Sequence, residues 1–130
     1  GSETWTMTNS LSKKVDGCYT RKLMMALNID WRLRLTNKVV YGKLPRVTSK
    51  IQERRMKLAG HIQRHDDLVA HRLTLWQPEH GRRSRGRPKS TFVDTIFRDT
   101  ELEDTNEIKR LMNDRQLWRD FIKSRTLKPP

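Results

Sequence analysis

Apolar residues recur at steps of three and four along most of this chain, which is the spacing of one helix face. The first such stripe predicts a helix over residues 10–27 and consists of Leu11, Val15, Cys18 or Tyr19, Leu23 and Ala26. Because Cys18 falls on the stripe and has no histidine next to it in sequence, we expect it to be a buried structural cysteine.

Residues 31–46 follow a less regular pattern. Residues 31–35 alternate apolar and basic side chains, which is compatible with a short strand, whereas Thr36 is a suitable N-cap for a short helix through Tyr41. Gly42 ends that helix and Pro45 prevents its continuation. We therefore expect a helical segment over residues 1–44 and a helical domain over residues 45–130.

The longest predicted helix covers residues 47–64. Ser49 and Gln52 have the spacing of a capping box at its start. Its basic residues fall at steps of four and three and share one face: Lys50, Arg54, Lys57, His61 and Arg64, with Arg55 beside them. Like charges at this spacing repel one another. Since no acidic partner accompanies the row, the pattern favours binding to phosphate groups over a solvated helix face.

The C-terminal part is expected to be helical as well. A short extended piece near Leu73, Leu75 and Trp76 is predicted to pack on the core, and Ser90 or Thr91 then caps a helix through Phe97. Another helix begins at Thr105 and is broken near Asn113. The fold class predicted is mainly α: a small bundle of about five helices with a basic loop and one short extended segment.

Residues 81–89 are the basic loop. Two glycines and a proline keep this segment out of a regular helix. It has no acidic residue and carries five cations: Arg82, Arg83, Arg85, Arg87 and Lys89. Its core, Arg85-Gly86-Arg87-Pro88, is similar to an AT-hook, whose arginines lie in the narrow minor groove of A·T-rich DNA. A solvated loop that joins two helices is the alternative interpretation.

The net charge indicates which class of partner the chain binds. The chain has 130 residues, a net charge of +13 and a pI of about 10.6. A body this basic repels itself unless it meets a polyanion, so nucleic acid is the leading partner, with an acidic membrane surface second. The acidic run over residues 99–104 is interpreted as a loop that docks against the basic middle of the chain.

Membrane insertion and secretion are not indicated by the sequence. No stretch approaches the roughly 20 apolar residues of a spanning helix. A single cysteine excludes an internal disulfide and fits a reducing compartment. We therefore expect an intracellular protein, nuclear and cytoplasmic.

No catalytic or metal-binding constellation stands out. His61 and His65 stand four residues apart, a spacing that lets two imidazoles share a metal ion. The chain has neither a cysteine pair nor the glutamate of an HExxH motif, because Ile62 follows His61. We expect no metal, no other cofactor and no enzymatic activity.

Several motifs carry a resemblance to a known family by their order and spacing. They are Glu3-Thr4-Trp5-Thr6-Met7-Thr8, Val15-Asp16-Gly17, Leu35-Thr36-Asn37, Leu58-Ala59-Gly60-His61, Leu75-Trp76-Gln77-Pro78, Arg85-Gly86-Arg87-Pro88 and Asp114-Arg115 followed by Trp118-Arg119. As a set they resemble the C-terminal region of reverse transcriptases encoded by non-LTR (LINE-type) retrotransposons. The resemblance covers nearly the whole chain.

The resemblance implies a non-catalytic part of a larger RNA-directed DNA polymerase. In that family this region begins around the helical thumb, which makes residues 1–44 thumb-like and residues 45–130 a nucleic-acid-binding tail. The catalytic Tyr-x-Asp-Asp motif belongs to the upstream palm, and Asp66-Asp67, preceded by Arg64-His65, is not that motif. Some members carry a Cys/His zinc knuckle, for which this chain lacks the cysteines. The implied partners are template RNA, RNA–DNA hybrid or DNA, and the rest of the polypeptide.

Two alternatives stay open. The first is a protein-interaction module whose acidic patch and tryptophan-bearing helices dock on the polymerase body, with the charge serving solubility. The second is an AT-hook-like minor-groove DNA binder based on residues 85–88. The salt dependence of nucleic-acid binding tests the first, and a preference for A·T-rich duplex tests the second.

Overall fold

The computed structural model describes residues 1–67, 69–74, 86 and 91–126. Two short 3-10 helices, η1 (Ser2–Thr4) and η2 (Trp31–Leu33), accompany seven α-helices in these ranges. The α-helices are α1 (Asn9–Ala26), α2 (Asn37–Tyr41), α3 (Val47–Gln63), α4 (Val69–Thr74), α5 (Phe92–Thr100), α6 (Thr105–Asn113) and α7 (Arg115–Thr126). The described ranges contain no strand, so the expectation of a mainly α fold is confirmed.

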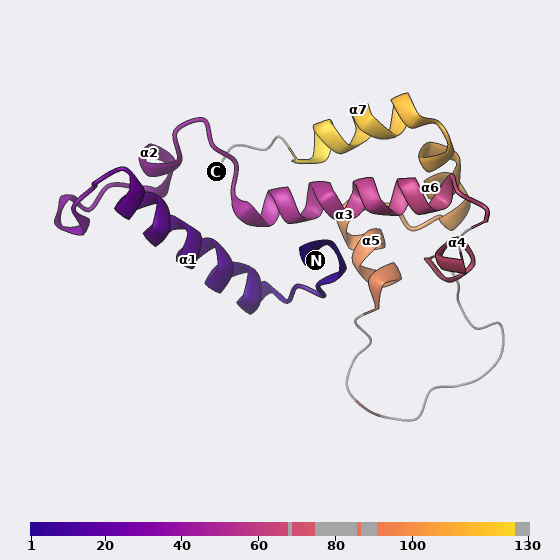
Figure 1. Ribbon diagram of the computed structural model, residues 1–130, viewed down its shortest axis with the longest axis horizontal. Helices are drawn as coiled ribbons and strands as arrows, with labels where there is room; N and C mark the ends of the chain where they lie inside the picture. The colour runs from indigo at the N-terminus through magenta and orange to yellow at the C-terminus, as the bar shows by residue number, and fades with distance from the viewer. Residues whose placement is uncertain (68, 75–85, 87–90, 127–130) are drawn as a thin grey trace.

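Helix α3 is the central element of the molecule (Figure 1). Helices α1, α4, α5, α6 and α7 and the turn η1 all contact it, whereas α2 packs on α1. In Figure 1, α7 runs alongside α3, and α1 and α2 extend beyond its N-terminal end. Because residues from both ends of the chain pack on this one helix, its faces determine where each other element lies.

The core lies between α3 and the three C-terminal helices. It contains Met56, Ala59, Ile96, Ile108, Met112, Trp118 and Ile122. The predicted start of α5 is confirmed, since the Thr91 side chain accepts from the Asp94 backbone N–H and Asp94 accepts from Thr91 in return. The predicted break near Asn113 is also confirmed, because Asp114 separates α6 from α7.

The N-terminal helix α1 supplies a cap to α3. The carboxylate of Asp16 accepts hydrogen bonds from the backbone N–H of Thr48 at 3.1 Å and from its hydroxyl at 2.8 Å. Negative charge there satisfies an orphan donor and opposes the positive end of the helix dipole. The expected Ser49–Gln52 capping box is wrong, because α3 begins at Val47 with no side-chain cap from Arg46.

Other predictions for the helices and loops need correction. Residues 69–74 form helix α4 where an extended piece was expected, and Leu73 is 62% exposed, so it does not pack on the core. Residues 31–33 form η2 where a strand was one alternative. Cys18 is exposed, because α1 buries no residue fully. Leu75 and Trp76 lie outside the described residues, as does all of the basic loop 81–89 except Gly86.

The expected boundary at residues 44–46 coincides with the turn between α2 and α3. The two sides of this boundary are in contact, since η1 and α1 both pack on α3. None of the described helices is both long and apolar enough to cross a bilayer.

Candidate nucleic-acid interface

The basic row on α3 is largely accessible. Lys50, Arg54, Lys57 and His61 are exposed, and Arg64, which follows the last residue of the helix, is half-buried. The opposite side of α3 carries the buried Met56 and Ala59. The predicted division of α3 into a basic face and a core face therefore agrees with the burial of these residues.

The row is not free of acidic partners, which corrects an expectation. The carboxylate of Glu53 accepts from Lys57 Nζ at 2.6 Å and from Lys50 Nζ at 2.9 Å. The hydrogen bonds from Lys57 and Lys50 hold the pKa of Glu53 below its usual value. Two of the expected phosphate-binding charges are thus partly neutralised within α3.

Arg55 does not belong to the accessible surface, although we placed it beside the basic row. Its side chain is 2% exposed, and Nη1 donates to Asp99 Oδ2 at 2.5 Å. Its other donors bind the carbonyls of Glu3 at 3.2 Å and Trp5 at 3.0 Å. Burial raises the pKa of Asp99, and the guanidinium opposes that shift. Arg55 is therefore a structural link between η1, α3 and α5.

A second group of cations faces the C-terminal half of α3 across a cleft of about 390 Å³. We call it the basic cleft and define it by its lining residues, which are Lys57, His61, Arg64, Arg115, Trp118, Arg119 and Ile122. Helix α3 and the residue after it supply one wall, and α7 supplies the other. None of the lining residues is a carboxylate, although the neighbouring Glu53 on α3 pairs with Lys57.

The indole of Trp118 holds these walls together. Trp118 is buried, and its Nε1 donates to the carbonyl of Met56 at 2.9 Å. A Cβ atom at Gly60 would overlap the indole, so glycine is what allows α7 this close to the backbone of α3. Asp114 caps α7 by accepting from the backbone N–H groups of Gln116 and Leu117. Arg115 and Arg119, one turn apart on either side of Trp118, are thereby carried to the cleft.

Positive charge in the cleft is only partly compensated, because Lys57 pairs with Glu53 on α3 at 2.6 Å. Burial lowers the pKa of Arg64, and the charges of Arg115 and Arg119 lower it further. Arg64 remains a cation, because a guanidinium is not deprotonated in proteins. Its Nη1 donates to the carbonyl of Met112 at 2.6 Å, which fixes the group at the cleft wall. An anion with several acceptor oxygens would relieve this repulsion.

The sequence did not identify Arg115 and Arg119 as site residues. The available signal was their i,i+4 spacing around Trp118, which puts both at the edge of a buried face. The predicted residues of the basic loop cannot be added to the cleft, because Arg82, Arg83, Arg85, Arg87 and Lys89 lie outside the described residues.

His61 lines the cleft, and His65 lies just beyond the end of α3. The ring centroids of His61 and His65 are 4.3 Å apart. In the described part of the chain, no group of three or more His, Cys, Asp or Glu is arranged to hold a metal ion.

Comparison with known proteins gives no relative: no family model, no curated protein and no solved structure matches the chain. The described residues therefore define a small helical protein with a basic cleft that no carboxylate lines.

Proposed function

We propose that this chain is a non-catalytic nucleic-acid-binding element, the C-terminal region of a non-LTR retrotransposon reverse transcriptase, which holds template RNA or an RNA–DNA hybrid through phosphate contacts. The basic cleft is the observation that carries the proposal. It joins Lys57 and Arg64 to Arg115 and Arg119 with no carboxylate among its described lining residues.

Phosphate groups fit this cleft for physical reasons. Three guanidinium groups offer planar pairs of donors that match phosphate oxygens. Arg64 is already fixed by Met112, so binding orders fewer groups than a set of free side chains would. The exposed cations Arg54 and Lys50 continue the positive surface along α3. A polymer of phosphates is therefore a better match than a single small anion.

Residues of the separate motifs that carry the resemblance contact one another in the fold. Gly60, from the Leu58–His61 motif, lies against Trp118, from the last motif. Arg55 lies in α3, and it binds the backbone carbonyls of Glu3 and Trp5 in the first motif. Residues that define the resemblance thus include residues that hold the fold and build the cleft.

The alternative of docking through the acidic patch is less favoured by the structure. Asp99 is buried against Arg55, and Glu101 forms an ion pair with Arg125. Asp104 caps α6 by accepting from the backbone N–H of Asn106. Three of the acids in residues 99–104 therefore serve the chain itself, and less negative charge remains for a partner.

The proposal is tested by removing charge from the cleft without disturbing the core. Arg115→Ala combined with Arg119→Ala removes two exposed cations, whereas Lys13→Ala with Lys14→Ala removes the same charge from α1. The cleft variant should bind single-stranded RNA, RNA–DNA hybrid and duplex DNA more weakly. The slope of the logarithm of its binding constant against the logarithm of the salt concentration should shrink by roughly 0.7–0.9 per lost phosphate contact.

The α1 variant is the matched control and should lose less affinity and less slope. A folded cleft variant that binds with the slope of the parent chain would refute the proposal. Circular dichroism of both variants establishes that each is still helical.

A further inference from the structure

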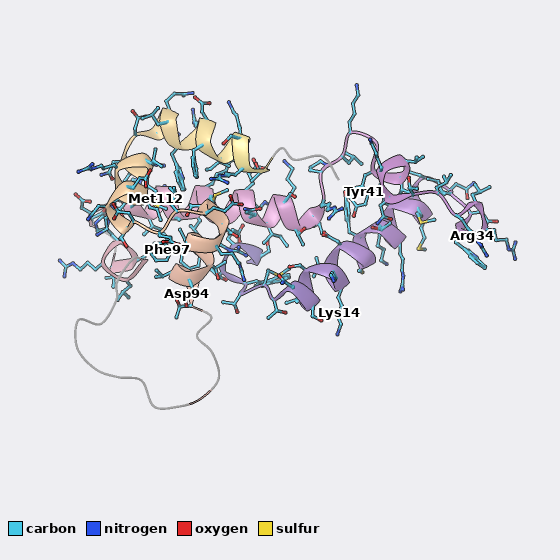
Figure 2. All side chains as sticks on the ribbon, turned by 180° about the vertical axis from the view of Figure 1, so that it is seen from behind. Lys14, Arg34, Tyr41, Asp94, Phe97 and Met112 are labelled. Atoms are coloured by element: carbon cyan, nitrogen blue, oxygen red, sulfur yellow. The ribbon has the colours of Figure 1, made fainter. Side chains whose placement is uncertain are left out.

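The end of the molecule formed by α1, η2 and α2 exposes many large apolar side chains. We call residues 25–44 the tip. Its exposed apolar residues are Met25, Leu27, Trp31, Leu33, Leu35, Val39 and Leu44. Figure 2 shows the labelled Arg34 at the end of the molecule opposite Met112 of the core. The tip is therefore a separate surface from the basic cleft.

Trp31 is the most distinctive residue of the tip. Its side chain is 72% exposed, although tryptophan usually buries most of its surface. The turn η2 holds the residue in place: the Asp30 carboxylate accepts from the Arg32 backbone N–H at 2.9 Å, and the Arg34 N–H donates to the Trp31 carbonyl. An exposed indole on an ordered turn is a flat apolar surface available to a ligand.

One cation lies over this indole, and further exposed cations belong to the same end of the molecule. The Arg32 guanidinium lies 5.7 Å from the ring centroid, and Arg34 follows in the left-handed conformation at φ 46°. Arg21, Lys22, Lys38 and Lys43 are exposed on the neighbouring helices and turn. Asp30 is the one acidic residue between Asp16 and Glu53; its carboxylate caps η2 and also lies 3.7 Å from Arg32 Nη1, so the charge of Arg32 is partly compensated.

A ligand for this surface must combine negative charge with exposed flat rings. Duplex nucleic acid is a polyanion, but its base faces are stacked within the helix. A single strand exposes both its phosphates and its base faces. Single-strand-binding proteins use this combination of cations and aromatic side chains, on which successive bases stack.

We propose that the tip is a binding site for unpaired nucleotides, in which Trp31 stacks on a base and Arg32 and Arg34 contact the adjoining phosphates. This inference rests on the proposed nucleic-acid-binding function and extends it by naming unpaired bases as a ligand of a second surface. An acidic peptide would also satisfy the charge of the tip, but it would use Trp31 only as apolar area.

Three substitutions of Trp31 distinguish stacking on its ring from contact with its apolar area. Trp31→Phe keeps an aromatic ring, Trp31→Leu keeps apolar area without a ring, and Trp31→Ala removes both. Binding of fluorescein-labelled oligo(U) and of a duplex DNA is measured by anisotropy with the 130-residue chain. Because Trp31 is exposed, all three variants should keep the melting temperature of the parent chain.

The expected result is selective loss of single-strand binding. Trp31→Ala and Trp31→Leu should weaken oligo(U) binding by about tenfold or more, whereas Trp31→Phe should stay within about threefold of the parent. Duplex binding should be unchanged in all three. If Trp31→Leu binds oligo(U) as well as the parent does, or if duplex and oligo(U) weaken equally, stacking on Trp31 is refuted.

Failure of the underlying function gives a different result. A parent chain that binds neither oligo(U) nor duplex refutes nucleic-acid binding as a whole, and the stacking site with it. Binding of both ligands that depends on Arg115 and Arg119 but not on Trp31 refutes the stacking site alone.

Discussion

Trp118 lies against Gly60 so closely that the indole occupies the place where any other residue would have its Cβ atom. The same indole donates from Nε1 to the carbonyl of Met56, one turn earlier in α3. A glycine inside a helix usually costs stability because of its backbone freedom. Here that cost is offset by a buried contact that only glycine permits.

Gly60→Ala should therefore destabilise the protein, although alanine is the better helix former. The added methyl group forces the indole away and lengthens its bond to Met56, which should cost roughly 1–3 kcal/mol of unfolding free energy. Gly17→Ala is the matched control, because nothing lies within 4 Å of a Cβ at Gly17 in helix α1. The control should gain up to about 1 kcal/mol. Urea denaturation measures both, and a stabilising Gly60→Ala would contradict the packing described.

The buried pair of Arg55 and Asp99 should be sensitive to removal of one partner. Asp99→Ala leaves the guanidinium buried without its carboxylate and should cost about 3–5 kcal/mol. Replacing both together, Arg55→Met with Asp99→Leu, leaves no unpaired charge and should cost less than Asp99→Ala alone. Thermal or urea unfolding of the two variants provides the comparison. Equal losses of stability in the two variants would show that the loss of the ion pair causes the destabilisation, and not the unpaired charge that remains in Asp99→Ala.

Glu53 should restrain nucleic-acid binding by α3. Glu53→Gln frees Lys57 and Lys50 from their acidic partner, so affinity should rise roughly two- to fivefold, with a steeper salt dependence. Glu107→Gln on α6 removes the same charge away from α3 and serves as the control. Affinities that rise equally in both variants would indicate an effect of net charge alone.

The same carboxylate predicts a pH dependence of stability. The pKa of Glu53 is lowered in the folded protein from its ordinary value of 4.5. The ionised carboxylate therefore contributes fully to folding stability above pH 4.5, and this contribution is lost as the pH falls through the lowered pKa. Glu53→Gln should be less stable than the parent at neutral pH, and the difference should disappear in acid. If the stability difference between Glu53→Gln and the parent grew on acidification, the ionised carboxylate would not be the stabilising form.

The basic loop should act through charge and not through groove recognition. Arg85→Lys with Arg87→Lys keeps the charge but removes the planar donor forks, and this variant should bind RNA almost as well as the parent. Replacement of both by alanine should weaken binding to every nucleic acid. Titrations with A·T-rich and G·C-rich duplex distinguish binding by charge from recognition of the minor groove. If the lysine variant loses a preference for A·T-rich DNA, the AT-hook interpretation is correct.

The helices that the sequence predicts well are those with a long apolar period or a clear cap. Thr91 with Asp94, and the apolar positions from Ile108 to Ile122, place α5, α6 and α7 correctly. Residues 69–74 were assigned wrongly, because a short run with few apolar residues does not distinguish a helix from an extended segment. Cys18 was placed inside because a stripe shows which residues share a face and not whether another element covers it.

The candidate site was only half predictable for a similar reason. Spacing along α3 groups Lys57, His61 and Arg64, because these contacts are local. Arg115 reaches the same cleft only through the docking of α7, which depends on the fit of Trp118 against Gly60. The burial of Arg55 likewise depends on Asp99, 44 residues further along the chain. Such long-range pairings leave no periodic trace in the sequence.

The position of α3 between its partners has a consequence for biosynthesis. Helix α3 leaves the ribosome before the residues that complete it, since Asp99 follows Arg55 by 44 positions and Trp118 follows Met56 by 62. Chains are made at roughly 5–20 residues per second, so the nascent helix spends several seconds with its apolar side uncovered. During that interval it is a natural substrate for chaperones, and the chain can adopt its final shape only once α7 has been translated.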